Sequence, residues 1–389
     1  MSARYDEVTA DGLLTAEELR LRDRVREVVA DEVAPRAALL DATGQFAHES
    51  YQALARAGLG GLIFPERLGG AQLSTTGYAV AMEEIAAGCG ATSLVYMTQM
   101  HTGYPILLSG DEELAQRYLS GLCAGKLYGS LAITEPGAGS DVSGLRTTAR
   151  REGQHYVIDG AKTFITTGDR ADVIICFATV DRSAGRDGIT AFVVDGDTPG
   201  LRRGAALSKM GMHASGTAEL FFDGTRVPAE NRIGEEGSGW RLVMRSVVKS
   251  RISAAAQGVG LASGAYAHAL ATLRESGPIS DDVAFPLAEL RASILQGRLI
   301  LRSTARASDV DSSAPLTAEV AMMKLACTDL GWRVALTVTD LLGSRGDLAE
   351  LGVERYLRDA KVTQIYDGTN EVQRLLIARD TASRGKEAE

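Results

Sequence analysis

The spacing of apolar side chains changes twice along this chain. Apolar residues recur at helical intervals from residue 12 to about 125, then form short runs separated by Gly, Asp and Pro as far as residue 233, and return to helical intervals after residue 240. A succession of short strands with no helices between them is typical of a β-barrel or sandwich, and long helices pack as a bundle. We therefore predict a mainly α protein with a middle β-domain, divided into residues 1–125, 126–235 and 236–389.

Local signals predict the individual elements. Thr15 followed by Glu18 forms a capping box that opens a helix running to Val33, which Pro35 is expected to end. Further helices are predicted at 49–57, 76–87, 112–121, 240–273, 285–310, 316–342, 352–365 and from about 369. Strands are predicted at 128–134, 155–159, 173–180, 190–194 and 219–222, with Asp-Gly pairs at 159–160 and 223–224 as turns between strands.

Composition excludes several classes of function. The net charge of −9 argues against nucleic-acid binding, which needs clustered Lys and Arg. The four cysteines lie far apart, without metal-ligand or redox spacing, so we expect reduced thiols, no metal site and a cytoplasmic protein. The first residues lack the basic start and apolar run of a signal peptide, and no apolar stretch is long enough to span a membrane.

The segment from Leu131 to Gly144 carries the strongest chemical signal. A predicted strand ends in Thr134-Glu-Pro-Gly-Ala-Gly-Ser-Asp141, a loop with two close glycines and several hydroxyls. Glycines let a ligand approach the backbone, and free N–H groups and hydroxyls can hold its polar atoms. The order of glycines differs from the dinucleotide-binding fingerprint. By composition alone, a plain glycine-rich turn is an equally good interpretation.

Two further segments belong to the β-region. Lys162-Thr-Phe164-Ile-Thr166 places an aromatic ring and a hydroxyl two residues apart on a predicted strand, hence on one face, which suits a flat ring that also needs a hydrogen bond. A core Phe beside a surface Thr is the commoner arrangement when the segment is taken alone. The stretch 209–228 has no chemical role that its residue types indicate.

A fourth segment contains a candidate general base. In Gln364-Ile-Tyr-Asp-Gly-Thr369 a helix ends, an Asp-Gly turn follows, and Thr369 is placed to cap the next helix. Asp367 precedes that helix, whose dipole is expected to keep the carboxylate ionised. An ionised carboxylate in an apolar cleft can remove a proton from a substrate. The alternative is an Asp that only makes the turn.

Taken together and in this order, the four segments resemble the acyl-CoA dehydrogenase family over roughly residues 15–380. Thr134-Glu-Pro-Gly-Ala-Gly-Ser-Asp141 and Arg358-Asp-Ala-Lys361, the latter followed by the turn around Asp367, are the most specific motifs. The resemblance implies an N-terminal helical domain, a middle β-domain and a C-terminal four-helix bundle. It also implies FAD between the last two domains, a homotetramer or dimer, and electron transfer to a carrier such as electron-transfer flavoprotein.

The resemblance also implies roles for individual residues. Leu131, Ile133 and Thr134 would line the isoalloxazine ring, with Thr134 and Thr166 hydrogen-bonded to it and Phe164 beside it. The remaining implied contacts to FAD are Gly139, Ser140, Tyr366, Thr369 and Glu371, with Asp340, Gly343 and Ser344 reaching the FAD of a neighbouring subunit. The implied contacts to the acyl thioester are Ser140, Arg251, Tyr366 and Gly368.

The implied reaction is α,β-dehydrogenation of an acyl thioester. Asp367 would remove the α-proton while hydride leaves the β-carbon for flavin N5, with the thioester carbonyl polarised by hydrogen bonds. The family usually has Glu at this position, and Asp is shorter by about 1.5 Å, a misplacement that can cost about a hundredfold in rate. Other relatives carry the base at the position of Ser250, which cannot serve.

Other departures affect the cofactor and substrate contacts. Val248 replaces an acid that contacts the pantetheine arm in relatives, and the stretch 275–282 lacks the family's Arg-x-x-Phe-Gly loop, which grips FAD. A flavin oxidase of a non-thioester substrate, using Asp367 as in nitroalkane oxidases, is therefore the second hypothesis, and a non-catalytic binding protein is the third. The sequence does not determine the acyl group, which depends on the depth of a cavity beside helices around 97–108 and 254–261. His101 in the first of these is interpreted as a core or surface residue.

Overall fold

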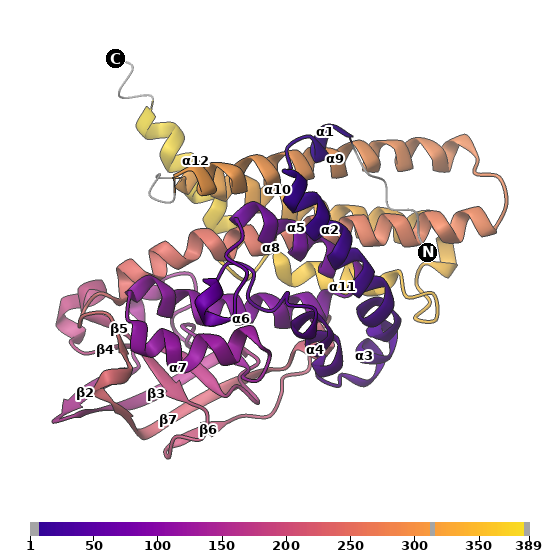
Figure 1. Ribbon diagram of the computed structural model, residues 1–389. Helices are drawn as coiled ribbons and strands as arrows, with labels where there is room; N and C mark the ends of the chain where they lie inside the picture. The colour runs from indigo at the N-terminus through magenta and orange to yellow at the C-terminus, as the bar shows by residue number, and fades with distance from the viewer. Residues whose placement is uncertain (1–7, 312–315, 385–389) are drawn as a thin grey trace.

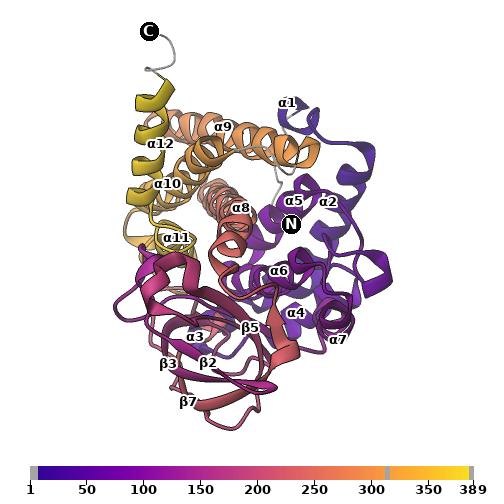
Figure 2. The same cartoon turned by 90° about the vertical axis from the view of Figure 1, so that its left-hand side faces the viewer.

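A computed structural model describes residues 8–311 and 316–384. Figure 1 shows three parts: helices of the first third packed in the middle, a twisted sheet below them, and long helices of the last third above. Figure 2, turned by 90°, shows that the central helix α8 lies between the N-terminal helices and the other C-terminal helices. The predicted mainly α fold with a middle β-domain is therefore confirmed.

The N-terminal region is helical. Its helices are α1 (Val8–Asp11), α2 (Ala16–Val28), α3 (Ala37–Thr43), α4 (His48–Arg56), α5 (Thr75–Gly88), α6 (Gly90–Ser109) and α7 (Glu112–Cys123). The capping box is confirmed, because Thr15 Oγ1 accepts from Glu18 N at 3.2 Å and Glu18 Oε2 accepts from Thr15 N at 2.9 Å. The expectation that Pro35 ends the helical path is wrong. A π-turn and a 3₁₀-turn carry the chain into α3, and Pro35 lies in the first turn of the latter, where a proline needs no N–H partner.

The middle region is one sheet of eight strands. The strands are β1 (Gly129–Ala132), β2 (Thr148–Glu152), β3 (His155–Thr166), β4 (Val173–Thr179), β5 (Ile189–Asp195), β6 (Leu201–Arg203), β7 (Thr217–Pro228) and β8 (Arg232–Ile233). They follow the order β6-β7-β3-β2-β4-β5-β8, with β1 beside β4. Pairing is antiparallel except where β1 and β2 meet β4. Sequence patterns did not predict β2, β6 or β8.

The two Asp-Gly pairs do not end strands, which corrects the prediction. Asp159-Gly160 lies inside β3 and Asp223-Gly224 inside β7, and the two strands pair along their length. A register shift between Ile158 and Gly160 marks a β-bulge, and Gly224 N donates to Asp159 Oδ1 at 2.7 Å. Opposed bulges bend both strands together, so the residues that make turns elsewhere curve the sheet here.

The C-terminal region contains α8 (Gly239–Glu275), α9 (Asp281–Val310), α10 (Thr317–Leu341), α11 (Glu354–Thr363) and α12 (Asn370–Arg384). The helix α8 packs against α5, α6, α9, α10 and α11, and its first turns lie against the sheet (Figure 1). Among the described helices none combines the length and the apolar character that crossing a membrane requires.

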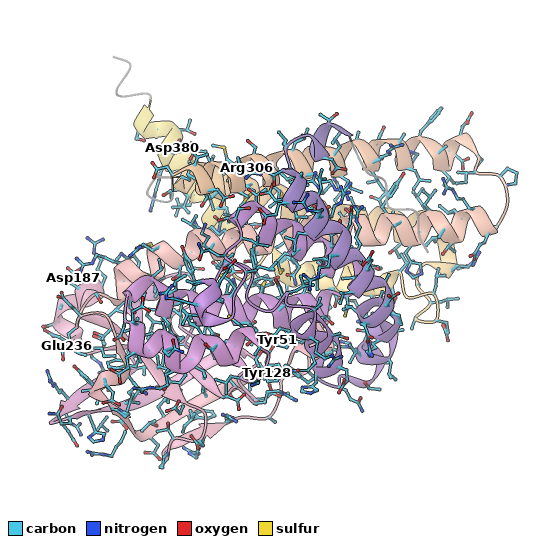
Figure 3. The ribbon with its side chains drawn as sticks, in the orientation of Figure 1. Tyr51, Tyr128, Asp187, Glu236, Arg306 and Asp380 are labelled. Carbon is cyan, nitrogen blue, oxygen red and sulfur yellow. The ribbon has the colours of Figure 1, made fainter. Side chains whose placement is uncertain are left out.

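Polar and aromatic contacts hold the three regions together. Glu83 of α5 is buried and pairs with Arg298 of α9 at 2.6 Å, and Arg306 of α9 pairs with Glu18 at 2.5 Å. In Figure 3, Tyr51 of α4 lies beside Tyr128, just before β1, and their ring centroids are 5.5 Å apart. The helical region and the start of the sheet are thus packed as one unit.

Candidate active site

Asp367 lies in the turn between α11 and α12, where the backbone is unusual. Its φ is +55°, a conformation that few residues other than glycine adopt, and Gly368 follows at +87°. A Cβ on Gly368 would lie 2.7 Å from Gln373 Nε2 and 3.7 Å from Arg251 Nη2. Such strain persists only where the surroundings hold it, and it is common at active sites.

The carboxyl group of Asp367 is buried and incompletely paired. Its Oδ2 is shielded from solvent and has no hydrogen-bond partner in the described part of the chain. Burial raises the pKa of Asp367 above its usual value, although His101, Lys324, the Ser250 hydroxyl and Arg251 each act in the opposite direction. Burial thus outweighs the favourable charges in setting the direction of the shift, an influence that the expectation of a carboxylate beside a helix N-terminus left out.

Two neighbours of Asp367 anchor the turn to the bundle. The hydroxyl of Tyr366 donates to Gln257 Oε1, and Gln257 Nε2 donates to Ser93 Oγ at 2.6 Å. Lys324 Nζ donates to Asn370 Oδ1 at 2.9 Å at the start of α12. Thr369 Oγ1 accepts from Val372 N at 3.3 Å, which confirms the predicted cap. The turn is thus tied to α8 and α10 on both sides of Asp367.

The glycine-rich loop is held by a buried ion pair that sequence reasoning missed. Lys162 Nζ lies 2.8 Å from Glu135 Oε1 and 2.9 Å from Ile133 O. The same carboxylate accepts from Arg146 N at 2.6 Å and Thr147 N at 2.9 Å. No local pattern marks this pair, because its members are 27 residues apart and meet only when β3 packs beside the loop.

The surface of this loop is open. A Cβ on Gly137 or Gly139 would meet no atom within 4 Å, and Ser140 is exposed. Leu131, Ile133 and Thr134 are half-buried at the end of β1. This arrangement matches the prediction of a surface that a ligand can approach closely.

Phe164 is exposed at an irregular point of β3, so its orientation does not follow from the predicted strand alternation. Its φ is +56°, and the β3–β7 register shifts between Lys162 and Ile165, so simple strand alternation does not relate Phe164 to Thr166. The Phe164 side chain is 69% exposed. A strained, solvent-exposed aromatic ring at a bulge is what a flat ligand would cover.

The helix α8 connects the loop to Asp367. Val247 packs against the same apolar cluster as Leu131 and Ile133. Ser250, whose hydroxyl lowers the pKa of Asp367, follows three residues later, about one helical turn further along. One stretch of α8 thus belongs both to the cluster beside the glycine-rich loop and to the surroundings of the predicted base.

The predicted cofactor residues near position 340 lie elsewhere in the molecule. Asp340, Gly343 and Ser344 are exposed at the end of α10, and Arg345 Nη1 donates to Ser276 Oγ at 2.9 Å. Ser276, just past the end of α8, and Ser250 are separated by more than two thirds of that helix, about 40 Å at 1.5 Å per residue. These residues therefore lie far from Asp367 of their own chain, and their role in the FAD site of a neighbouring subunit stays a prediction.

The segment 209–217, which had no predicted role, joins the sheet to the helices. Met212 N donates to Asp359 Oδ1, and His213 lies between Asp41 O and Lys209 O at 2.9 Å from each. Burial raises the pKa of Asp359 to about 6. These contacts hold the segment preceding β7 against α3 and α11, which positions the sheet relative to the turn that carries Asp367.

Comparison with known proteins identifies the family. Models of the acyl-CoA dehydrogenase N-terminal, middle and C-terminal domains match residues 15–126, 130–225 and 237–382. Cyclohex-1-ene-1-carbonyl-CoA dehydrogenase from Geobacter metallireducens is 39% identical over 94% of this chain and 98% of its own. The chain belongs to the acyl-CoA dehydrogenase family. It is therefore a member of a family of flavin oxidoreductases, in agreement with the predicted class of enzyme.

Solved structures of acyl-CoA dehydrogenase type have the same fold. Butyryl-CoA dehydrogenase from Megasphaera elsdenii superposes with a TM-score of 0.90 at 32% identity, over 95% of this chain and 99% of the other. The prolyl acyl carrier protein oxidase AnaB gives 0.89 at 30% identity, over 95% and 99%. PigA, in a structure with FAD and proline, gives 0.89 at 25% identity, over 95% and 99%.

Proposed function

We propose that this acyl-CoA dehydrogenase family member catalyses FAD-dependent α,β-dehydrogenation of an acyl thioester, with Asp367 as the base. The observation that carries the proposal is the unpaired, buried Oδ2 of Asp367, at the position in the turn before α12 that the family resemblance assigns to the base. A free carboxylate oxygen beside a ligand surface is placed to accept a proton from a bound substrate.

The environment of Asp367 suits proton removal from a weakly acidic carbon. A raised pKa makes the carboxylate a stronger base than an exposed Asp, while the cations nearby keep its ionised form accessible. The backbone N–H of Asp367 has no acceptor among the described residues, so it is available to the thioester carbonyl. Because Asp is one methylene shorter than Glu, the α-carbon must lie closer to this turn than in relatives with Glu.

We propose FAD as the cofactor, held by the open face of the glycine-rich loop. Leu131, Ile133, Thr134 and Thr166 would hold the isoalloxazine ring, Phe164 would cover it, and Gly139 and Ser140 would contact the pyrophosphate. The open glycines and the exposed Phe164 ring fit a large flat ligand with a charged tail. When bound, FAD accepts the hydride that leaves the β-carbon.

We propose Ser140, Arg251, Tyr366 and Gly368 as contacts to the thioester, and a homotetramer or dimer in which Asp340, Gly343 and Ser344 complete the FAD site of a neighbour. Thr369 and Glu371 would lie against the adenosine part. Electrons would pass to electron-transfer flavoprotein or a similar carrier. We propose CoA as the group that carries the acyl chain. A carrier-protein thioester is the alternative that the similarity to AnaB supports.

An anaerobic titration of the flavin-loaded protein tests the proposal. Acyl-CoAs from short to long, branched and cyclic are added while flavin absorbance is followed. At least one is expected to bleach the flavin, and Asp367→Asn should abolish bleaching while keeping the flavin bound. Asp187→Asn, at an exposed position (Figure 3), is the matched control and should behave as the parent protein.

Two outcomes contradict the proposal. A yellow protein that no CoA or carrier-protein thioester bleaches, but which consumes oxygen with a nitroalkane, would favour the non-thioester oxidase. A protein that takes up no FAD would contradict FAD-dependent catalysis and favour the non-catalytic binding protein.

A further inference from the structure

His101 lies in α6 beside the polar residues Thr98, Gln99 and Thr102, whose side chains are all hydrogen-bonded to backbone carbonyls of the same helix. Met97 and Met100, which precede it, are buried, and Tyr104 and Leu108, which share the His101 face at helical spacing, are half-buried hydrophobic side chains. The Nε2 atom of His101 is shielded from solvent and has no hydrogen-bond partner among the described residues. An unpaired polar atom of this kind costs about 1–3 kcal/mol, so a purely structural histidine is a poor explanation.

Other histidines of the chain show what a satisfied imidazole looks like. Both ring nitrogens of His213 are hydrogen-bonded to backbone carbonyls at 2.9 Å, and Nδ1 of His48 lies 2.8 Å from the hydroxyl of Tyr128. His268 packs its ring edge-on against Tyr356, with centroids 6.2 Å apart. Only for His101 does the described structure leave a buried ring nitrogen without a partner.

His101 lies within electrostatic reach of Asp367. Each group shifts the pKa of the other, yet the two do not form a hydrogen bond. Burial lowers the pKa of His101 more than the carboxylate raises it, so the imidazole is neutral at pH 7. Arg251 Nε is a third buried atom without a partner. Three elements, α6, α8 and the turn before α12, thus each carry a buried polar atom without a partner, and the groups on α6 and α8 both act electrostatically on Asp367.

We infer that His101 recognises a neutral oxygen, a hydroxyl or a carbonyl, on the acyl chain beyond its β-carbon. The inference rests on the proposed function and specifies its substrate class. In that reaction the α-carbon must meet Asp367 and the β-carbon must meet the flavin, so only carbons further along the chain can carry the group that pairs with His101. A neutral imidazole can donate to or accept from such an oxygen.

A carboxylate at the same position fits less well. It would share a buried space with the Asp367 carboxylate, and His101 carries no charge to compensate for it. Lys324 and Arg251, the latter beside Gly368, already act on the Asp367 carboxylate, and a second carboxylate in this buried space would repel the first.

The test compares matched pairs of acyl-CoAs on the flavin-loaded protein. Butyryl-CoA is paired with 4-hydroxybutyryl-CoA, and hexanoyl-CoA with 5-oxohexanoyl-CoA, and the apparent second-order rate constant of flavin reduction is measured for each. The oxygenated member of at least one pair is expected to react about tenfold faster or more, since loss of a buried hydrogen bond costs that much in discrimination. His101→Leu should reduce this ratio to near one, and His101→Gln, which keeps a donor and an acceptor, should retain part of it.

The control is His268→Leu, the same chemical change at a half-buried position that faces Tyr356 instead of Asp367, and it should leave the ratio unchanged. Equal rates within every pair, or a preference that survives His101→Leu, would overturn the inference while leaving the dehydrogenase function intact. Fastest reduction by glutaryl-CoA would overturn the assignment to a neutral oxygen. Failure of every thioester to reduce the flavin would overturn the proposed function and this inference with it.

Discussion

The ammonium group of Lys162 lies 2.8 Å from the Glu135 carboxylate in an environment closed to solvent, with the lysine side chain fully buried and the glutamate 6% exposed. Glu135 is the second residue of the glycine-rich loop, so the pair connects the proposed flavin surface to β3. Burial opposes ionisation of Glu135, but Lys162 and the backbone N–H groups hold its pKa below the usual value.

Replacing Lys162 with Met should therefore destabilise the protein by about 3–5 kcal/mol, because it leaves a buried carboxylate unpaired. The glycine-rich loop should loosen as well, so FAD affinity should fall. Thermal denaturation and flavin retention on gel filtration measure the two effects. The double variant Lys162→Met with Glu135→Leu should recover most of the stability, and a double variant as unstable as the single one would contradict this account.

Asp367→Asn should be more stable than the parent protein at neutral pH, although inactive. The folded-state pKa of Asp367 is raised, so the protonated form stabilises the fold below the unfolded pKa of about 3.8, and that contribution is lost as pH rises through the folded pKa. The difference in melting temperature between variant and parent, measured without ligand, should therefore be small near pH 4 and grow towards pH 7. A difference in melting temperature that shrinks from pH 4 to pH 7 would show that ionisation of Asp367 does not destabilise the folded protein.

Lys324→Met should shift the pH dependence of flavin reduction. The Lys324 ammonium lowers the pKa of Asp367, and burial brings its own pKa down to about 8. Without it the Asp367 pKa rises further, so the acid limb of the rate profile, where the base is protonated, should move to higher pH. In the variant, Asn370 Oδ1 loses the Lys324 donor but still accepts from the Thr328 hydroxyl at 3.1 Å, so the start of α12 should stay in place. Stopped-flow reduction across pH 5–9 measures the shift, with the exposed Lys126→Met as a control that should leave the profile unmoved.

Gly368→Ala should impair both stability and catalysis. The added Cβ would sit 2.7 Å from Gln373 Nε2 at a φ of +87°, so the turn that carries Asp367 must shift. We expect a loss of about 1–3 kcal/mol and at least a tenfold slower flavin reduction. Gly77→Ala in α5 is the control, because its Cβ would meet neighbours at no less than 3.4 Å and helix propensity favours alanine. Equal stability and equal rates of flavin reduction in the two variants would show that the backbone at position 368 tolerates a Cβ.

The succession of a helical, a β and a second helical region follows from sequence, because local spacing and capping encode it. The capping box at Thr15, the cap at Thr369 and the division into helical, β and helical regions depend on residues within a few positions of one another. Linear motifs likewise indicated the family, since the glycine-rich loop and the turn around Asp367 are each continuous in the chain.

The tertiary structure decided what these local signals leave open. The Asp-Gly pairs became bulges because β3 and β7 pair across them, and Glu135 found Lys162 only through that packing. The pKa of Asp367 rises because packing of distant elements buries it, an effect larger than those of His101, Lys324 and Arg251, which lower it. The unpaired, buried Nε2 of His101 also became visible only in the tertiary structure. Burial and pairing depend on which distant groups meet, and no local sequence pattern encodes that.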